Sequence, residues 1–549
     1  MRARLSLAVA VAAIVLLAIP ESAGAQTGPA AALTGLVTSD QEGAMEGVVV
    51  SAKKAGSIVT VSVITDAQGR YSFPANRLEA GKYTLKIRAA GYDLTAPTTA
   101  DVVDEQTANV DLKLRKARNL AAQMSNGEWM MSLPGAESDK AFLLNCVGCH
   151  TVERIVRSSH DADQWAQTIV RMRGYAPVSQ PIKPQRMLDP ARSGRPEAFR
   201  KEAEYLASIN LSDVSQWEYP LKTLARPSGR ATRVVITEYD MPRPTTEPHD
   251  VIVDAQGMVW YSDFGELFIS KFDPKTLKLT EYPTKEFKPG APVGNLSLEF
   301  DKRGTLWFDS MFQGALGNLD PKTGEIKYYP LAPEYNDVRV QLNFVGLRHD
   351  VDGKVWTKSV GTQEVFRLDL ATEKWERFQP LKELSGAALS IYQVISDSQN
   401  NLWMAEFTKG HIGKIDAKSG QVTWFPLPTD NARARRMNID DQDRILFTEY
   451  RGNKVALFDT RSEKLTEWAL PPHTYPYRAA MDKNGEIWTG GMHTDRAVRL
   501  DPKTGQTVEY LLPRETNMRT VFVDNTTTPV TFWVGSNHGA ALVKVEPLD

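Results

Sequence analysis

Residues 401 to 407 read Asn401-Leu402-Trp403-Met404-Ala405-Glu406-Phe407, an apolar strand with a tryptophan near its start. Strands of this kind recur from residue 234 to the end of the chain, at intervals of 42 to 49 residues. The residues at the repeated position are Trp260, Trp307, Trp356, Trp403, Leu446, Trp488 and Trp533. Half of the chain's twelve tryptophans therefore occupy one position of a repeat, which is typical of residues that pack between stacked sheets. Seven copies predict a seven-bladed β-propeller over residues 233–549.

The two ends of this repeat region complement each other. The last copy ends after Lys544-Val545-Glu546 without its fourth strand, and residues 233 to 239 have the pattern of that missing strand. We therefore predict that the early segment completes the last blade and closes the ring. Closure in this way gives the last blade its full set of strands.

The repeat resembles the propeller of the virginiamycin B lyase (streptogramin lyase) family, in stretches such as residues 401–407 and Asp501-Pro502-Lys503-Thr504-Gly505. The resemblance implies the elimination reaction by which that family linearises cyclic depsipeptides, with a histidine base, a supporting glutamate and Mg²⁺. On this resemblance the catalytic residues are His249, as the base, and Glu247, within Glu247-Pro248-His249. The family's second glutamate falls on Phe264, with Asp263 beside it. The resemblance thus implies the fold more firmly than the reaction.

A propeller brings the starts of its inner strands and the ends of its tryptophan strands to one face, where they line a funnel. The predicted inner-strand starts are His249, Asn295, Asn343, Tyr392, Arg435, Tyr477 and Arg519. The predicted ends of the tryptophan strands are Asp263, Glu406, Glu449, His493 and His538. Such a mouth offers histidine bases, carboxylates for a divalent cation such as Mg²⁺, and arginines for an anionic group. The alternative is that these charges only pair with one another around the ring.

The chain's only two cysteines lie in Cys146-Val147-Gly148-Cys149-His150. Thiols at this spacing add to the two vinyl groups of one porphyrin, and the histidine that follows is placed to ligate the iron. A structural zinc site needs four ligands, and the chain has no second cysteine pair. We therefore predict one covalent haem c, held by Cys146 and Cys149, with His150 as an axial ligand of the iron.

Residues 121–226, around this motif, have a helical pattern. We expect an attachment helix over 139–151, a second helix over 161–173 and a third over 199–209. The second carries Trp165, Ile169 and Met172 at helical spacing, and this arrangement resembles a class of c-type cytochrome domains with Trp-x-x-x-Val/Ile-x-x-Met after the haem motif. Met172 is our choice for the sixth iron ligand; Met187, His160 or an open site are the alternatives.

Residues 32–116 alternate short β-rich runs with turn residues, which predicts a small β-sandwich. The run from Thr65 to Phe73, with Tyr83 and Tyr92 each following a glycine within two residues, resembles the carboxypeptidase regulatory-like (carbohydrate-binding-like) domain. Such a domain serves as a structural or docking module, or it binds a glycan or polymer. The residues leave both roles open.

Residues 1–25 have the features of a cleaved signal peptide: two arginines, an apolar run from Leu5 to Ile19, and Ala23-Gly24-Ala25 before Gln26. We therefore expect a periplasmic or secreted protein with no membrane span after cleavage. The 65 Lys and Arg nearly balance the 67 Asp and Glu, which argues against a nucleic-acid partner.

The sequence thus predicts a multidomain, mainly β protein: a small β-sandwich, an all-α cytochrome c domain and a seven-bladed propeller. We favour an exported haem protein in which the cytochrome domain exchanges electrons with a small-molecule substrate or a periplasmic partner that the propeller binds. A streptogramin-type lyase and a non-enzymatic scaffold are the alternatives, so the sequence does not decide between an oxidoreductase, a lyase and no enzyme. Elimination moves no net electrons, so a fused haem gives a lyase no benefit.

Overall fold

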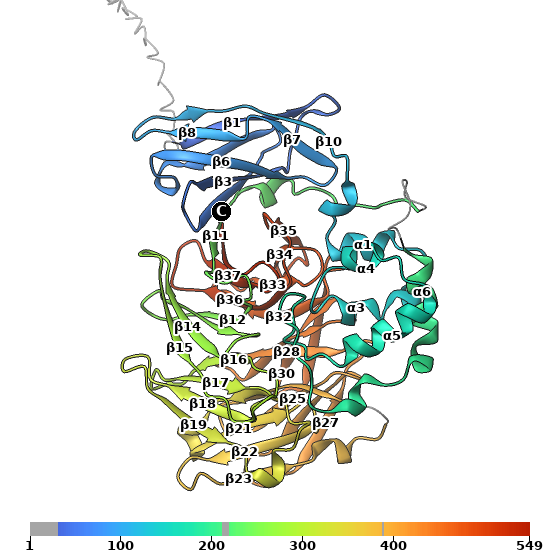
Figure 1. Cartoon of the computed structure of the whole chain (residues 1–549). Coiled ribbons are helices and arrows are strands. Elements are labelled where there is room, and N and C mark those ends of the chain that lie inside the picture. Colours follow the sequence, from blue (N-terminus) through green and yellow to red (C-terminus); the bar gives the residue numbers. More distant parts are fainter. Residues whose placement is uncertain (1–30, 211–218, 387–388) are drawn as a thin grey trace, which may run out of the picture.

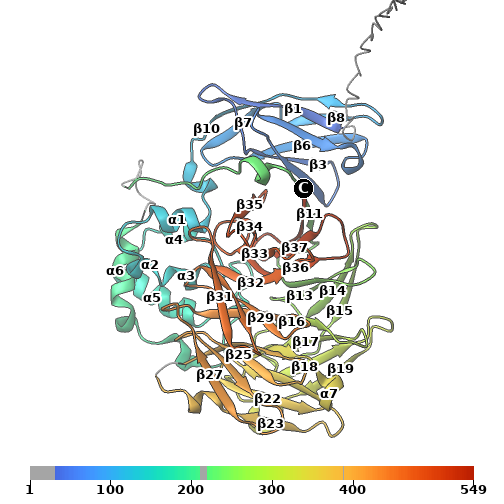
Figure 2. The same ribbon diagram turned by 180° about the vertical axis from the view of Figure 1, so that it is seen from behind.

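The computed structural model describes residues 31–210, 219–386 and 389–549. Three parts follow one another along the chain: a β-sandwich, a helical segment and a ring of β-sheets (Figure 1). The view from behind also shows the helices against one side of the ring and the sandwich beyond its last blade (Figure 2). The expected signal peptide, residues 1–25, lies outside the described residues. Within the described ranges, no helix has the length and apolar character needed to cross a membrane.

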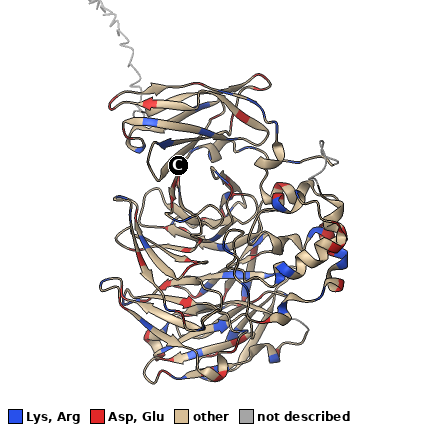
Figure 3. Cartoon of the chain, viewed as in Figure 1, with Lys and Arg blue, Asp and Glu red and all other residues tan. Residues whose placement is uncertain are grey.

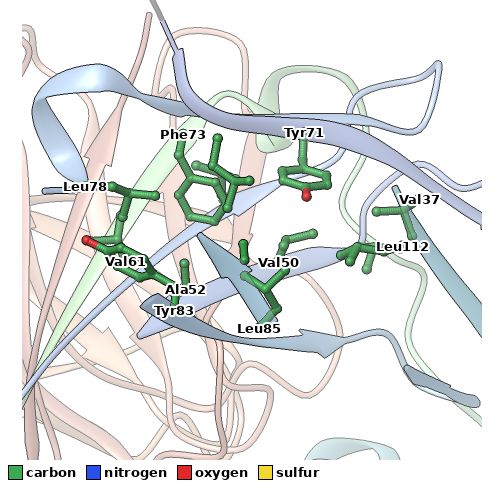
Figure 4. Close-up of a cluster of buried hydrophobic side chains, with 14 of the residues drawn as sticks. Val37, Val50, Ala52, Val61, Tyr71, Phe73, Leu78, Tyr83, Leu85 and Leu112 are labelled. Atoms are coloured by element: carbon green, nitrogen blue, oxygen red, sulfur yellow. The ribbon is translucent and has the colours of Figure 1, made fainter. Parts of the chain in front are cut away.

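The sandwich consists of a sheet of β1, β2, β5, β7, β9 and β10 packed on strands β3, β4, β6 and β8. The strands are β1 Ala31–Ser39, β2 Gly43–Ala44, β3 Val49–Lys54, β4 Val59–Ile64, β5 Arg70–Pro74, β6 Gly81–Arg88, β7 Tyr92–Ala96, β8 Thr99–Val102, β9 Ala108–Asn109 and β10 Leu112–Lys116. Alternate residues of these strands face inward. Tyr71 and Phe73 of β5 thus meet Val50 and Leu85 in the core (Figure 4).

Six four-stranded antiparallel sheets make up most of the ring. The first three are β12 Pro248–Val253, β13 Val259–Asp263, β14 Phe268–Asp273, β15 Lys278–Pro283; β16 Asn295–Phe300, β17 Leu306–Ser310, β18 Ala315–Leu319, β19 Ile326–Pro330; and β20 Leu342–Gly346, β21 Lys354–Ser359, β22 Glu364–Asp369, β23 Trp375–Phe378. The next three are β24 Ile391–Ser396, β25 Leu402–Glu406, β26 His411–Ile415, β27 Val422–Pro426; β28 Ala434–Ile439, β29 Arg444–Glu449, β30 Lys454–Asp459, β31 Lys464–Ala469; and β32 Pro476–Met481, β33 Ile487–Gly491, β34 Arg496–Leu500, β35 Thr507–Leu511. A short helix, α7 His349–Asp352, lies in the connection between β20 and β21.

The seventh sheet closes the ring. It contains β36 Met518–Asp524, β37 Thr531–Ser536 and β38 Ala541–Pro547, and β11 Val234–Asp240 pairs antiparallel with β38. Inner strands of neighbouring sheets pack on one another around the circle, and β36 packs on β12. The predictions of seven repeats and of closure by the early strand are therefore confirmed.

The same closing strand joins the ring to the sandwich. The free edge of β11 pairs with β4, with Val235 opposite Val63 and Tyr239 opposite Val59. One eight-stranded sheet therefore runs from the last blade into the sandwich, in the order β36-β37-β38-β11-β4-β3-β6-β8. This pairing satisfies backbone groups that an outer blade strand otherwise leaves at an edge.

The repeated tryptophans are buried between the sheets, as the repeat predicts. Four of them share one device: an aspartate six residues earlier binds turn amides with one carboxylate oxygen and accepts the indole N–H with the other. The pairs are Asp254 with Trp260, Asp301 with Trp307, Asp397 with Trp403 and Asp482 with Trp488, at 2.8 to 3.1 Å. Each pair links the turn before a strand to the packing between sheets.

The helical segment contains α1 Asn126–Ser132, α2 Glu137–Lys140, α3 Leu143–Cys146, α4 Val152–Val156, α5 Ala162–Arg173 and α6 Arg200–Ser208. The second and third expected helices correspond to α5 and α6. The expectation of one attachment helix over 139–151 is wrong: α2 and α3 are separate short helices, and the chain turns after Cys146. Basic and acidic residues are both spread over the sandwich, the helices and the ring (Figure 3).

Removing the aspartate of one aspartate–tryptophan pair should destabilise its blade. Asp482→Ala leaves the buried Trp488 indole N–H without its acceptor and two turn amides unbound, which costs about 1–3 kcal/mol. We expect a lower thermal unfolding midpoint, measured by circular dichroism. Asp501→Ala is the matched control, because Asp501 caps an exposed turn of the same blade through Lys503 and Thr504. Equal midpoints for the two variants would contradict the role of the indole bond.

Candidate functional site

The inner strands bring the predicted funnel residues together at the face of the ring that the helical segment covers. Six of the seven predicted starts are the second residues of their strands: His249, Asn343, Tyr392, Arg435, Tyr477 and Arg519. The prediction is one residue out in the second blade, where Asn295 begins β16 and Leu296 occupies the equivalent position. Asn295 instead binds the loop carbonyls of Glu266 and Phe268.

The sequence did not predict that the residues directly after these positions also take part in the funnel. Each inner strand has a register shift directly after its first residues, as between Pro248 and Val251 or between Ala434 and Met437. A bulge of this kind lets two consecutive side chains lie on the same side of a strand. His249 and Asp250 do so, with His249 Nδ1 2.7 Å from Asp250 Oδ1.

Asp250 is the centre of a buried network that spans the ring. Arg436, from the opposite strand β28, donates to both of its carboxylate oxygens at 3.1 and 2.6 Å, and Thr520 Oγ1 also donates to Oδ1. Although burial opposes ionisation, the Arg436 guanidinium lowers the pKa of the Asp250 carboxyl to about 2. Through the ionised carboxylate of Asp250, Arg436 and Thr520 therefore join blades five and seven to blade one.

His249 is enclosed on every side. Its Nε2 lies 3.3 Å from the Tyr477 hydroxyl, its Nδ1 faces Asp250, and the Phe264 ring lies at a tilt with its centroid 4.5 Å away. Burial lowers the pKa of His249 to about 4, against the opposing effect of Asp250. The side chain is completely buried, so the structure gives this histidine two intramolecular partners and no exposed nitrogen.

Aromatic side chains form the wall of the funnel next to the helical segment. Tyr450, Tyr477 and Met492 belong to one apolar cluster with Cys146 and Trp165, and Tyr392, Phe407, Tyr475 and Ile169 pack against it. Tyr450 Oη lies 3.0 Å from His493 Nε2. Burial, together with the nearby Arg435 and Arg519, lowers the pKa of His493 to about 3. The wall therefore combines apolar surface with neutral histidine.

A loop after α5 covers the other half of the mouth. Ala176 and Val178 are buried in one cluster with Phe264 and Leu296, and Met187 packs against that cluster. Gln185 holds the loop in place, because its amide accepts from Val293 N at 2.8 Å and donates to the carbonyls of Gly265 and Val293. The helical segment is thus bound to the ring by both apolar and polar contacts.

The Cys146–His150 motif lies against the last blade. Asn517 Nδ2 is 3.4 Å from the Val147 carbonyl oxygen, Arg519 Nη2 donates to the Gly148 carbonyl oxygen at 2.8 Å, and His538 Nε2 is 3.4 Å from the same oxygen. The predicted Arg519 and His538 thus contact the motif directly. Asn517 was not predicted, because it lies one residue before β36 and has no repeated counterpart.

The side chains of the motif are free thiols and one half-buried histidine. Cys146 and Cys149 are both free, and burial raises the pKa of their thiols to about 12 and about 11. His150 Nδ1 lies 3.1 Å from the Thr151 carbonyl oxygen, which leaves Nε2 for a ligand, and burial lowers the pKa of His150. A neutral histidine with one nitrogen fixed by a carbonyl is the usual form of a metal ligand.

The three candidate sixth ligands occupy different environments. Met172 lies near the end of α5 with 42% of its surface exposed. Met187 is half-buried, and its N–H binds the Gly174 carbonyl oxygen. His160 packs edge-on against Trp165, with ring centroids 5.2 Å apart.

The predicted carboxylates stabilise loops. Asp263 Oδ1 accepts the amides of Glu247 and Gly265, and Glu406 accepts those of Ser390, Thr408 and Lys409. Glu449 and Glu247 are buried, Glu449 with both carboxylate oxygens and Glu247 with Oε2 unpartnered, and burial raises the pKa of both. Across the described ranges, no group of three or more His, Cys, Asp or Glu is placed to hold a metal ion.

Comparisons with known proteins match two parts of the chain. Residues 381–547 match the virginiamycin B lyase family, and residues 32–115 match the carboxypeptidase regulatory-like domain. The lyase match begins after Glu247 and His249. No curated protein matches the chain.

Several solved structures are similar to the chain. The virginiamycin B lyase of Staphylococcus aureus is 22% identical, covers 57% of this chain and 99% of its own, and has a TM-score of 0.48. Its catalytically inactive variant with quinupristin is 21% identical, covers 57% of this chain and 99% of its own, and scores 0.49. The extracellular domain of a one-component system protein from B. thetaiotaomicron is 17% identical, covers 55% of this chain and 40% of its own, and scores 0.42.

Replacing Asp263 should change how stability depends on pH. Burial raises the pKa of the Asp263 carboxyl to about 7 from an ordinary value of 3.8. Its contribution to the free energy of unfolding, on the order of a few kcal/mol, is complete below the ordinary pKa and is lost as pH rises through 7. Asp263→Asn keeps the shape of the side chain without a charge. The difference in unfolding midpoint, variant minus wild type, should therefore increase from pH 5 to pH 8.5.

Thermal unfolding at the two pH values measures this gain. The control is Asp416→Asn, because turn amides and Ser419 lower the pKa of that exposed carboxyl and keep it ionised throughout. The same pH dependence in Asp263→Asn as in the wild type would show that Asp263 does not take up a proton in the folded protein.

Proposed function

We propose that the chain is an exported haem protein that transfers electrons through one covalently bound haem c, while the ring binds a substrate or partner. The observation that carries the proposal is the contact of three ring residues, Asn517, Arg519 and His538, with the backbone of the Cys146–His150 motif. Electron transfer to a molecule in the funnel needs the redox group beside the mouth, and this contact supports that placement.

The residues around the motif fit a haem. Cys146 and Cys149 would hold the porphyrin through thioethers, and His150 would ligate the iron through Nε2, since Nδ1 is engaged by the Thr151 carbonyl. The aromatic wall of Tyr392, Phe407, Tyr450 and Tyr477 provides apolar surface on the ring side. When bound, haem c supplies one-electron exchange. The chain's own residues hold the group, exclude water and fix its orientation.

Met172 remains our proposal for the sixth ligand. Trp165 and Ile169 of α5 pack in the same cluster as Cys146, and Met172 lies one turn further along that helix face. Its side chain is free of the apolar cores, whereas Met187 packs against the cluster around Val178. A thioether in this position would make the iron six-coordinate, which suits electron transfer.

For the molecule that exchanges electrons with the haem, we propose a chemical class. Either a small molecule enters the funnel or a periplasmic redox protein docks beside it, and the mixed surface charge favours neither nucleic acid nor a polyanion. The sandwich shares a continuous sheet with the last blade, which favours its role as a structural or docking module over glycan binding.

The first test is the absorption spectrum of the protein exported with the cytochrome c maturation machinery. We expect haem that resists acid–acetone extraction and a reduced spectrum typical of haem c. The Cys146→Ala/Cys149→Ala variant should carry no covalent haem, while Asp501→Ala should retain it. A wild-type protein exported with the machinery but free of haem would overturn the proposed function.

The same spectra test the sixth ligand. Oxidised c-type haems with methionine ligation show a weak far-red band, so Met172→Ala should abolish it. Met187→Ala and His160→Ala should leave the band in place. Loss of the band in Met187→Ala alone would assign the ligand to Met187.

The match of residues 381–547 to the lyase family favours a second candidate, cyclic depsipeptide lyase activity. His249, the base implied by the resemblance, is buried with both nitrogens engaged. We therefore expect no linearisation of quinupristin by the protein with Mg²⁺, followed by mass spectrometry. Turnover that disappears in His249→Ala but persists in His411→Ala, a half-buried histidine of β26, would establish the lyase instead.

A further inference from the structure

Arg435 is an arginine without an acidic partner. Its guanidinium carbon lies 4.3 Å from the ring centroid of Tyr450, 4.4 Å from that of Tyr477 and 4.9 Å from that of Tyr392. Nη1 contacts Met492 Sδ at 3.0 Å, and Nε is buried without a partner. Among the described residues, no carboxylate forms an ion pair with this side chain. The next residue, Arg436, is in contrast paired with Asp250 through two hydrogen bonds.

A second arginine and two histidines extend this basic region toward the haem motif. Arg519 donates to Asn517 Oδ1 and to the Gly148 carbonyl oxygen, both neutral acceptors. His493 is buried and His538 is half-buried, and the Nδ1 of each has no partner. Both side-chain polar atoms of the buried Asn537 are also unpartnered. The carboxyl group that acts electrostatically on Arg519 is Glu247, whose Oε2 is likewise unpartnered.

This composition calls for an anion. A buried guanidinium without a counter-charge is costly, and the tyrosine rings offset this cost only in part through cation–π contacts. Tyr392 and Tyr450 also share side-chain hydrogen bonds with this guanidinium, but both are neutral, and Nε has no partner. The N–H groups of a guanidinium match the two oxygens of a carboxylate. Unpartnered histidine and asparagine atoms nearby add further hydrogen-bonding groups.

We propose that Arg435 binds a carboxylate where the funnel meets the Cys146–His150 loop. Two sources have this chemistry: a propionate of the covalently attached porphyrin, or an organic acid that enters the funnel. The first source rests on the proposed haem function and makes the ring the second wall of the haem pocket. The second source does not require the haem.

The first arm of the test uses the full-length, haem-loaded protein. Arg435→Met removes a positive charge that favours the reduced, less positive iron, so the midpoint potential at pH 7 should fall if the carboxylate is a propionate. Arg435→Lys keeps the positive charge but lacks the paired N–H groups of the guanidinium, and it should shift the potential less. Arg433→Met is the matched control, since Arg433 belongs to the same chain segment and stacks over Phe407 at 5.1 Å.

The second arm uses succinate as the probe of a free carboxylate. Calorimetry with wild-type protein should show saturable binding that weakens at least tenfold in Arg435→Met and is unchanged in Arg433→Met. If Arg435→Met does not fold, Arg435→Lys is measured in both arms, and it should show a smaller shift of potential or weaker succinate binding than the wild type.

Each result decides the proposal. A lower potential in Arg435→Met with no succinate binding assigns the carboxylate to the porphyrin, and lost succinate binding with an unchanged potential assigns it to a free acid. If no haem is attached but Arg435 governs succinate binding, the haem function fails and the carboxylate site stands. An unchanged potential together with unchanged or absent succinate binding overturns the proposal, as do equal effects in Arg433→Met.

Discussion

The pairing of β11 with both β38 and β4 is the constraint on which the rest of the molecule depends. The chain leaves the sandwich after Lys116, forms the helical segment and returns at Val234 as the strand that closes the ring. The segment leaves from β10 in the six-stranded sheet of the sandwich and returns into β11 of the eight-stranded sheet, which joins the sandwich to the last blade. Between these two strands, the Cys146–His150 motif contacts Asn517, Arg519 and His538 of the last blade.

Within the ring, the buried charges are balanced in one place and unbalanced in another. Arg436, Asp250, Thr520 and His249 satisfy one another across the channel, so this network stabilises the ring and keeps its blades in register. Arg435 and Arg519, toward the helical segment, contact rings and neutral oxygens instead. Structural pairing with a carboxylate thus accounts for the centre of the funnel, whereas aromatic rings and neutral oxygens surround the arginines of its mouth.

The periodic features of the fold could be predicted from sequence, and the local departures from regularity could not. Tryptophans at one repeat position and a missing last strand specify the number of blades and the closure, because every blade repeats the same packing. The helix expected over 139–151 ends at Cys146, where the ring takes the carbonyl groups of Val147 and Gly148 as acceptors. Such tertiary hydrogen bonds have no local sequence signal. Bulges in the inner strands likewise hid Asp250 and Arg436, because strict alternation places consecutive side chains on opposite sides.

The packing around His249 bears on the lyase chemistry that the sequence left open. An eliminating enzyme needs a base whose lone pair reaches a substrate proton, and His249 has Asp250 on one nitrogen and Tyr477 on the other. The Phe264 ring lies at a tilt against the histidine ring, with centroids 4.5 Å apart. Phe264 in turn packs in one cluster with Ala176 and Val178 of the loop after α5. On the other side, Tyr450 and Tyr477 pack in one cluster with Trp165 of α5, and Cys146 packs against that cluster. The surroundings of His249 are therefore part of the packing that holds the helical segment on the ring.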